Sequence, residues 1–422
     1  MEKHVAILNF AGCSNYGANL TAYALSLFCS RLGYTPALVD RRHLYLESGF
    51  DTPFSRFGER YLSWTTPCYG EHTFLALSAD YDTFIVGSDQ VWSYQPSWSG
   101  CHVQQHRIFD FADLPAGKKR IAMAASFGNG DYSRAPINFV KERAEALHRF
   151  TAISVREESG LSICRDCFGV RAEHVLDPVF LISTEEWGHL ADVGSMPLPD
   201  EFAAFCTLHS PYVPIRREIA SRWFSEGLSP VNLLGGEEVV DWVNIIRRCK
   251  VLVTDSFHAV CFGIIFRKPI IFLNIESRGG DRVPCLSRML GVQLPIFTES
   301  ELLGSTSETL DRITALRDTP LDYSATESIL ADKVVASHRF LQQAMEAPIP
   351  DGNTQVQVRP AELRAERRNY LIRLCKDFCL HLPQYLFLRF LGLFRLEFLA
   401  ESGNVKRLLQ RLWRQISYTL RH

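Results

Sequence analysis

Long apolar segments are missing from this chain of 422 residues. No uncharged apolar run reaches about 18 residues, the length that a membrane-crossing helix requires. The opening MEKHVAILNF lacks the basic and apolar regions of a secretory signal peptide and is typical of a first strand. With 46% hydrophobic and 22% charged residues, the composition is not that of a disordered chain either. We therefore expect a globular protein of the cytoplasm.

Matched cysteine pairs are scarce as well. The 12 cysteines are scattered singly, except for Cys164 with Cys167 and Cys375 with Cys379. A tetrahedral metal site needs a second pair at matching spacing, so we expect no structural metal. Ordinary reduced thiols explain Cys164 and Cys167 better than a redox pair does. We also expect no cofactor and no nucleic-acid partner.

The length and the hydrophobic pattern predict two α/β domains. A single core stops growing at roughly 250 to 300 residues, which this chain exceeds. Apolar strands without alternation, separated by amphipathic helices, indicate parallel sheets covered on both faces. The predicted strands lie near residues 4–9, 36–40, 83–87, 120–126, 152–155 and 173–176, and then near 201–208, 230–234, 251–254 and 270–274.

We interpret this series as two Rossmann-like, doubly wound domains facing a cleft, a GT-B-like arrangement. Residues 1–181 form the N-terminal domain and residues 182–346 the C-terminal one, which a long helix near 324–345 closes. Residues 347–360 lack apolar periodicity and contain three prolines, so they are typical of a linker.

Residues 361–422 form a basic tail. Twelve Lys and Arg against five Asp and Glu give it a net charge of +7, while the rest of the chain carries -9. The segment 404–421 places apolar and basic side chains on different helical faces, which suits an anionic membrane surface. We expect residues 382–421 to lie in such a surface rather than span it; packing on the protein or on a dimer partner is an equal alternative.

Ligands of open α/β sheets bind beyond the carboxyl ends of strands, where helix N-termini present free N–H groups. The loop NFAGCSNYGANL follows the first strand there: Gly12 and Gly17 allow close backbone approach, and Asn15 and Asn19 can hydrogen-bond a ligand. It does not match the G-x-G-x-x-G dinucleotide pattern. An ordinary glycine-containing turn is an equal interpretation.

Two further strand ends carry candidate residues. In FIVGSDQVW, Asp89 can accept a proton from a substrate hydroxyl, although capping the next helix is the favoured alternative. In ISVREES, the guanidinium of Arg156 suits a carboxylate or phosphate, because its planar fork binds two oxygens at once. A structural pair with Glu157 or Glu158 is the competing interpretation.

TDSFHAV is the strongest local signal. Ser256 is a plausible N-cap, which places His258 in the first turn of a helix. The positive end of the helix dipole disfavours a protonated imidazole, so a protonated His258 requires an anion beside it. Without such a partner, a neutral packed histidine is the ordinary interpretation.

Together, these motifs resemble the polysaccharide pyruvyl transferase family over about residues 5–345. The resemblance rests on NYGANL, FIVGSDQVW, AASFG (124–128), SVREES, VLDPVF (175–180) and TDSFHAVCFGIIFRKPIIF, in this order and spacing. It implies a fold like that of two-domain glycosyltransferases. It also implies transfer of pyruvate from phosphoenolpyruvate onto two hydroxyls of a sugar, as a cyclic ketal, in a surface polysaccharide or its lipid-linked precursor.

The resemblance also implies roles for residues of this chain. His258 is the expected general acid, Arg156 a ligand for the anionic groups of the donor, and Asp89 an acceptor-side catalytic residue. The expected substrate-binding set further contains Asn15, Tyr16, Gly17, Ser88, Ser126 and Ser256. The chain departs from the family pattern at Thr21 and Ala259, where glutamine and glycine are common.

Two other functions remain open at this stage. One is a glycosyltransferase of the same architecture that uses a nucleotide sugar, against which the lack of an evident nucleotide-binding pattern weighs. The other is a non-catalytic, membrane-associated scaffold, against which the retained His258, Arg156 and Asp89 weigh. A lipid-linked acceptor would explain a peripheral position on the inner face of the membrane.

Overall fold

The structure is a computed structural model that describes residues 3–44, 51–94, 106–128, 132, 135–233, 235–276, 279–304 and 307–349. The tail 361–422, with the predicted membrane-binding segment 382–421, lies outside the described residues, as does most of the predicted linker. Among the helices that are described, none combines the length and the apolar character needed to cross a bilayer.

The first domain is built on a seven-stranded parallel sheet with the order β3-β2-β1-β4-β5-β6-β7. Alternate residues of β1 enter different cores, Val5 and Ile7 on one face and Ala6 and Leu8 on the other, so both faces are covered as predicted. The strands are β1 Lys3–Leu8, β2 Tyr34–Asp40, β3 Trp64–Pro67, β4 Thr83–Val86, β5 Lys119–Ala125, β6 Ala152–Val155 and β7 Glu173–His174. The helices are α1 Tyr16–Arg31, α2 Pro53–Tyr61, α3 Glu71–Ala76, α4 His106–Phe109, α5 Ile137–Leu147 and α6 Glu158–Phe168.

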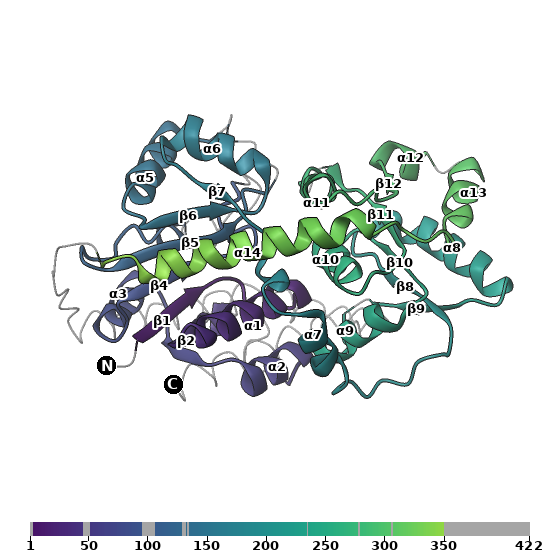
Figure 1. Cartoon of the computed structure of the whole chain (residues 1–422), viewed down its shortest axis with the longest axis horizontal. Coiled ribbons are helices and arrows are strands. Elements are labelled where there is room, and N and C mark those ends of the chain that lie inside the picture. The colour runs from purple at the N-terminus through teal and green to yellow at the C-terminus, as the bar shows by residue number, and fades with distance from the viewer. Residues whose placement is uncertain are drawn as a thin grey trace, which may run out of the picture.

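The second domain has a five-stranded parallel sheet with the order β12-β11-β10-β8-β9. Its strands are β8 Phe202–Cys206, β9 Ser229–Asn232, β10 Val251–Thr254, β11 Ile270–Leu273 and β12 Ile296–Phe297. Its helices are α7 Thr184–Ala191, α8 Val213–Ser225, α9 Val239–Arg248, α10 Phe257–Ile265, α11 Arg282–Leu290, α12 Glu299–Leu303 and α13 Ser307–Ala315. The prediction of two Rossmann-like domains in a GT-B-like arrangement is confirmed (Figure 1).

One apolar core is shared between the domains. Leu20 of α1 and Phe54 of α2 pack in the same cluster as Trp242 of α9 and Phe262 of α10. The short 3-10 helix η4 (Pro178–Phe180), which follows the first sheet, contributes to this cluster as well. The relative position of the two sheets is therefore fixed by hydrophobic burial and not only by the connecting chain.

The long helix α14 (Ser324–Glu346) extends across both domains (Figure 1). It was predicted to close the second domain. It begins there, yet its last turns bury Phe340 and Leu341 in a core of the first sheet, and the hydroxyl of Tyr34 donates to the carbonyl of Met345. The apolar residues of its last two turns find their partners far back in the sequence, a pairing that helical periodicity alone does not reveal.

Because of this packing, Leu341→Ala should destabilise the chain. Leu341 is fully buried, and emptying a buried leucine site usually lowers the free energy of unfolding by about 2–5 kcal/mol. Val335→Ala, at an exposed position of the same helix, should change it by less than about 0.5 kcal/mol. Urea unfolding followed by tryptophan fluorescence measures both; equal effects of the two variants would contradict the docking of α14 on the first sheet.

Candidate functional site

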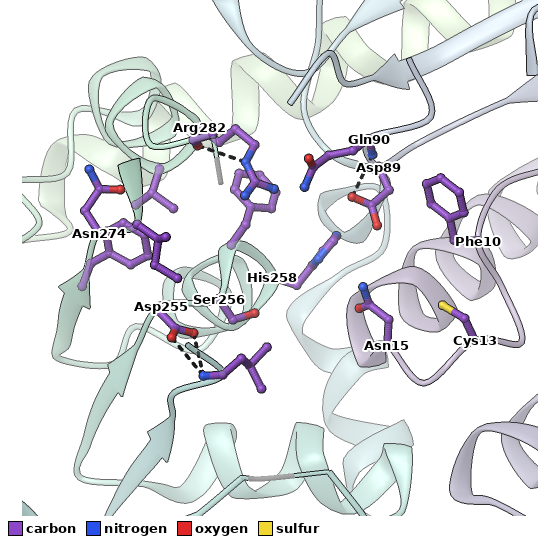
Figure 2. A pocket seen from close by; sticks show the side chains of 16 residues that line it. Phe10, Cys13, Asn15, Asp89, Gln90, Asp255, Ser256, His258, Asn274 and Arg282 are labelled. Atoms are coloured by element: carbon purple, nitrogen blue, oxygen red, sulfur yellow. Dashed lines mark hydrogen bonds between the residues drawn. The ribbon is translucent and has the colours of Figure 1, made fainter. Parts of the chain in front are cut away.

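A cavity of about 380 Å³ lies where the carboxyl ends of the two sheets face each other (Figure 2). In the first sheet, the strand order reverses between β1 and β4, and in the second between β8 and β10. Such switch points are where open α/β sheets bind ligands. The loops after these four strands supply most of the lining: Phe10, Cys13, Asn15, Asp89, Gln90, Leu208, Asp255, Ser256, Phe257 and His258. Residues near β11 and α11 complete it: Phe272, Asn274, Ile275, Gly279, Arg282 and Val283.

His258 projects into this cavity from the first turn of α10 (Figure 2). The helix begins as the sequence predicts, because the Ser256 hydroxyl accepts a hydrogen bond from the backbone N–H of Ala259. Only 6% of His258 is exposed. The helix start therefore holds the imidazole at the cavity wall, with little freedom to move.

The inner edge of the imidazole contacts the first domain. Nε2 of His258 lies 3.2 Å from the hydroxyl oxygen of Thr21 in α1 and 3.6 Å from Oδ2 of Asp177. Asp177 is thus the anion that a protonated histidine at a helix N-terminus requires. Sequence reasoning quoted the motif VLDPVF but gave Asp177 no role, because nothing local shows which loop meets α10.

Asp177 is completely enclosed and well paired. Its Oδ2 lies 2.8 Å from Nη1 of Arg156 and accepts a hydrogen bond from Ser88, while Oδ1 accepts one from the backbone of Val179. Burial by itself raises the pKa of this carboxyl, but the contacts with His258 and Arg156 outweigh it and leave the pKa well below its ordinary value of 3.8. The carboxylate therefore stays ionised and holds the ring of His258 in one orientation.

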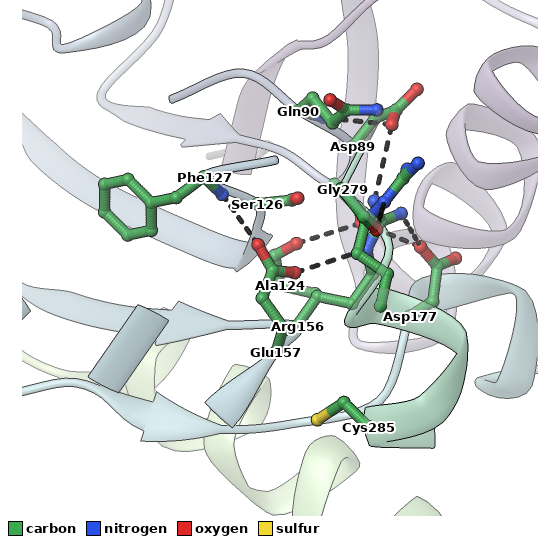
Figure 3. A network of polar contacts seen from close by, with 12 residues as sticks. Asp89, Gln90, Ala124, Ser126, Phe127, Arg156, Glu157, Asp177, Gly279 and Cys285 are labelled. Carbon is green, nitrogen blue, oxygen red and sulfur yellow. Dashed lines mark hydrogen bonds and ion pairs between the residues drawn. The ribbon is translucent and has the colours of Figure 1, made fainter. Parts of the chain in front are cut away.

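The predicted role of Arg156 needs correction. Its side chain is only 2% exposed, and it lies within 4 Å of three carboxylates, those of Asp177, Asp89 and Glu157 (Figure 3). Burial by itself lowers the pKa of the guanidinium, but the three carboxylates raise the pKa by more than burial lowers it. The charge of Arg156 is paired with these carboxylates, and its side chain does not line the cavity. Arg156 therefore has a structural role in this site. Its principal partner is Asp177 rather than Glu157 or Glu158.

Three other predicted binding residues also lie behind the wall of the cavity. Ser88 and Ser126 are completely buried, and their hydroxyls are engaged with Asp177 and with the backbone N–H of Gly128. Tyr16 donates a hydrogen bond to Glu237 and stacks on Trp242, both in the second domain. The geometry gives these residues structural roles, two within the first domain and one between the domains.

Gly17 lies directly against His258. A Cβ atom built on Gly17 would stand 2.0 Å from Nδ1 of the imidazole, closer than any real contact. Glycine is therefore required for close packing here and not for an unusual backbone angle. Gly17 serves the site by leaving space for the ring.

Asp89, Asn15 and Ser256 line the cavity, which is the position that their predicted roles require. Asp89 accepts a hydrogen bond from the backbone N–H of Gln90 and lies 3.5 Å from Arg156. Its favoured alternative role, capping the next helix, is wrong, since a bend and a turn at residues 90–92 follow it and no helix begins there. Asn15 caps α1 through the backbone N–H of Ala18, and the helix starts at Tyr16.

Arg282 is the main lining residue that sequence reasoning missed. It is the first residue of α11, and its Nε donates to the carbonyl of Gly279 at 3.1 Å. The pair Gly279-Gly280 is the signal that would have revealed it. This pair lies in a loop between strand β11 and a helix, the same position that the other ligand loops occupy after their strands.

A smaller cavity of about 290 Å³ adjoins the first and shares Asn274, Gly279 and Arg282 with it. Three carboxylates, those of Glu157, Glu276 and Asp281, make up most of its polar lining. The other residues that line it are Gly128, Ser159 and Gly280. Burial raises the pKa of Glu157, although Arg156 and a hydrogen bond from the backbone of Phe127 act in the opposite direction. The lining of the smaller cavity is thus more acidic than that of the larger one.

Two Rossmann-like domains, with a histidine and a buried aspartate meeting between facing switch points, define a two-domain α/β enzyme site. A model of the family "Polysaccharide pyruvyl transferase" matches residues 15–277, more than half of the chain. The chain belongs to the polysaccharide pyruvyl transferase family and is a transferase. No curated protein matches it.

Several solved structures share part of the architecture. UDP-GlcNAc 2-epimerase of Methanocaldococcus jannaschii is 11% identical, with a TM-score of 0.45, over 78% of this chain and 99% of that one. MnaA of S. aureus with UDP is 13% identical, with a TM-score of 0.46, over 78% and 95%. ADP-heptose lps heptosyltransferase II of E. coli is 15% identical, with a TM-score of 0.37, over 75% and 98%. At these values, the likeness carries no functional information.

The buried pair predicts the pH dependence of stability. Since the folded-state pKa of Asp177 lies below 3.8, its ion pair stabilises the fold above that pH, and this stabilisation is lost as the pH falls through 3.8 toward the lower folded value. Asp177→Asn leaves Arg156 buried without its main partner and should lower the free energy of unfolding at pH 7 by about 3–5 kcal/mol. The gap between the two proteins should narrow below pH 3.8.

Urea unfolding of both proteins between pH 7 and pH 3 measures this gap. Asp192→Asn is the matched control, because Asp192 is an exposed partner of Arg247. Its replacement should lower the free energy of unfolding by less than about 1 kcal/mol. A gap that stays constant with pH would show that Asp177 does not have a lowered pKa.

Proposed function

We propose that the protein transfers pyruvate from phosphoenolpyruvate onto two hydroxyls of a sugar, forming a cyclic ketal on a surface polysaccharide or its lipid-linked precursor. The observation that carries this proposal is His258, which faces the cavity with Asp177 behind it and Arg282 on the same wall. A histidine held by an ionised carboxylate suits a general acid, and a cation suits an anionic donor. Membership of the family supports the same reaction class.

In the proposed reaction, His258 protonates the methylene carbon of phosphoenolpyruvate. The neighbouring carbon becomes a cation, which one sugar hydroxyl attacks as it loses its proton. Phosphate then leaves with its bonding electron pair, and the second hydroxyl closes the ketal and loses its proton. The products are the ketal and hydrogen phosphate. Of the two protons that the hydroxyls lose, one returns to His258 and the other leaves with the phosphate. Asp177 stabilises the imidazolium at the start of this sequence.

The acceptor sugar fits the acidic side of the site. Carboxylates accept hydrogen bonds from hydroxyl groups but repel a donor with nearly three negative charges. Glu157, Glu276 and Asp281 in the smaller cavity therefore favour the hydroxyl-rich acceptor, and Asp89 in the larger one supports a role in accepting a hydroxyl proton. We place the reaction in the cytoplasm, with the tail on the inner face of the membrane where the acceptor is lipid-linked.

The donor is tested by thermal denaturation of the full chain with phosphoenolpyruvate and, separately, with a panel of nucleotide sugars. We expect Tm to rise with phosphoenolpyruvate concentration and not with the nucleotide sugars, because a ligand that binds the native state stabilises it. His258→Ala should retain this rise and lose at least about 100-fold in phosphate release with methyl glycoside acceptors. His148→Ala, which replaces an exposed histidine that does not line the cavity, should retain both. A rise with a nucleotide sugar alone would refute the proposed donor.

The packing of Gly17 on His258 predicts a second loss of turnover. Gly17→Ala places a methyl group within 2.0 Å of the ring, so the ring must leave its place between Asp177 and the cavity. Phosphate release should fall by about 100-fold or more, as for removal of the acid itself. Gly188→Ala is the control: this helical glycine lies in α7, where a Cβ meets only the flexible end of Arg247 at 3.3 Å. Full activity of Gly17→Ala would exclude His258 as the acid in this position.

A further inference from the structure

Arg282 differs from every other described residue that lines the larger cavity, because it is the sole lysine or arginine among them. It enters the cavity from the start of α11 and lies on the wall near His258 (Figure 2). A donor with a carboxylate and a phosphate needs a cation within reach of the acid. The cation assigned from sequence, Arg156, is buried behind this wall.

Two of the contacts that the Arg282 side chain makes help to set its direction. Its Nε donates to the carbonyl of Gly279, and its guanidinium carbon lies 5.9 Å from the ring centre of Phe257. The loop that carries Gly279 is itself held against the first domain, since a Cβ on Gly279 would stand 2.9 Å from the carbonyl oxygen of Gly128. The guanidinium is therefore presented by a loop with a close interdomain contact rather than by an unsupported surface chain.

The ring of Phe257 has two arginines beside it that serve different purposes. The guanidinium carbon of Arg156 lies 4.2 Å from the same ring centre, but three carboxylates surround that charge. Arg282 is half-buried and borders both cavities. The ring of Phe257 thus contacts both the buried arginine and the arginine that lines the cavity.

The acidic residues of the larger cavity are already compensated. The carboxylate of Asp255 accepts hydrogen bonds from the backbone N–H groups of Leu208 and His209, at 2.8 to 3.0 Å. Asp89 accepts one from Gln90 and lies 3.5 Å from Arg156. An anion in this cavity therefore meets Arg282, together with His258 and the positive end of α10, more strongly than it meets the two acids.

We infer that Arg282 binds an anionic group of the donor and holds the donor's methylene carbon against His258. This assignment rests on the proposed donor, phosphoenolpyruvate, and specifies the residue that recognises it. The planar fork of arginine pairs with two oxygens of a carboxylate or a phosphate at once, which fixes orientation as well as affinity. Arg282 also lines the acidic smaller cavity.

The test compares Arg282→Met and Arg282→Lys with Arg288→Met in thermal denaturation and in isothermal titration with phosphoenolpyruvate. Arg288 lies on the same helix, pairs with Asp281 at the surface and does not line either cavity, so it is a matched control. We expect Arg282→Met to weaken binding by at least about ten-fold, the loss typical of removing a charged hydrogen-bond partner. The affinity of Arg282→Lys for phosphoenolpyruvate should lie between those of the wild type and Arg282→Met, because lysine keeps the positive charge but lacks the planar guanidinium.

Inorganic phosphate and pyruvate, each added alone, distinguish the two anionic groups of the donor. If Arg282→Met no longer binds inorganic phosphate, Arg282 binds the phosphate of the donor. If it no longer binds pyruvate, Arg282 binds the carboxylate. Either result supports the inference. Wild-type affinity for phosphoenolpyruvate in Arg282→Met would overturn it while leaving the proposed function intact. No binding of phosphoenolpyruvate to the wild-type protein would instead overturn the proposed donor.

Discussion

The buried carboxylate of Asp177 is the interaction on which the arrangement of the site depends. A carboxylate removed from water is strongly unfavourable unless it is paired and fully hydrogen-bonded. Asp177 meets this requirement with groups from several elements: Arg156 after β6, Ser88 after β4, Thr21 in α1 and His258 in α10. Each of these elements is therefore held in one place by the same charge. The histidine of one domain is positioned by an anion of the other.

Such a pairing is useful only if the domains keep their relative position, and the apolar core supplies this condition. The cluster that joins α1 and α2 to α9 and α10 lies on the side of the site where His258 meets Thr21. Tyr16 reinforces it by stacking on Trp242 and donating to Glu237. Helix α14 adds a second connection, from the second domain to the core of the first sheet. Hydrophobic burial thus fixes the distances that the electrostatic network requires, which is how a catalytic geometry is preorganised.

The sequence predicted the sheets well because buried parallel strands are continuous apolar runs, as in TFIVG and VLVT. It did not predict β3 and β12, which are short edge strands with little apolar pattern of their own. It also located the ligand loops, since strand ends can be recognised locally. What it could not reveal was that Arg156 is buried away from the cavity and that Arg282 lines it instead. That depends on which carboxylates surround Arg156, and these come from residues as distant in sequence as Asp89 and Asp177.

The directions of the hydrogen bonds around His258 decide which ring nitrogen carries the exchangeable proton. An ionised carboxylate only accepts hydrogen bonds, so the single hydroxyl proton of Thr21 goes to Asp177, 3.3 Å away. The same hydroxyl then accepts from Nε2 of His258, so Nδ1 is the nitrogen that would give the proton in the proposed reaction. Nδ1 is the atom next to Gly17, where a side chain would cover it.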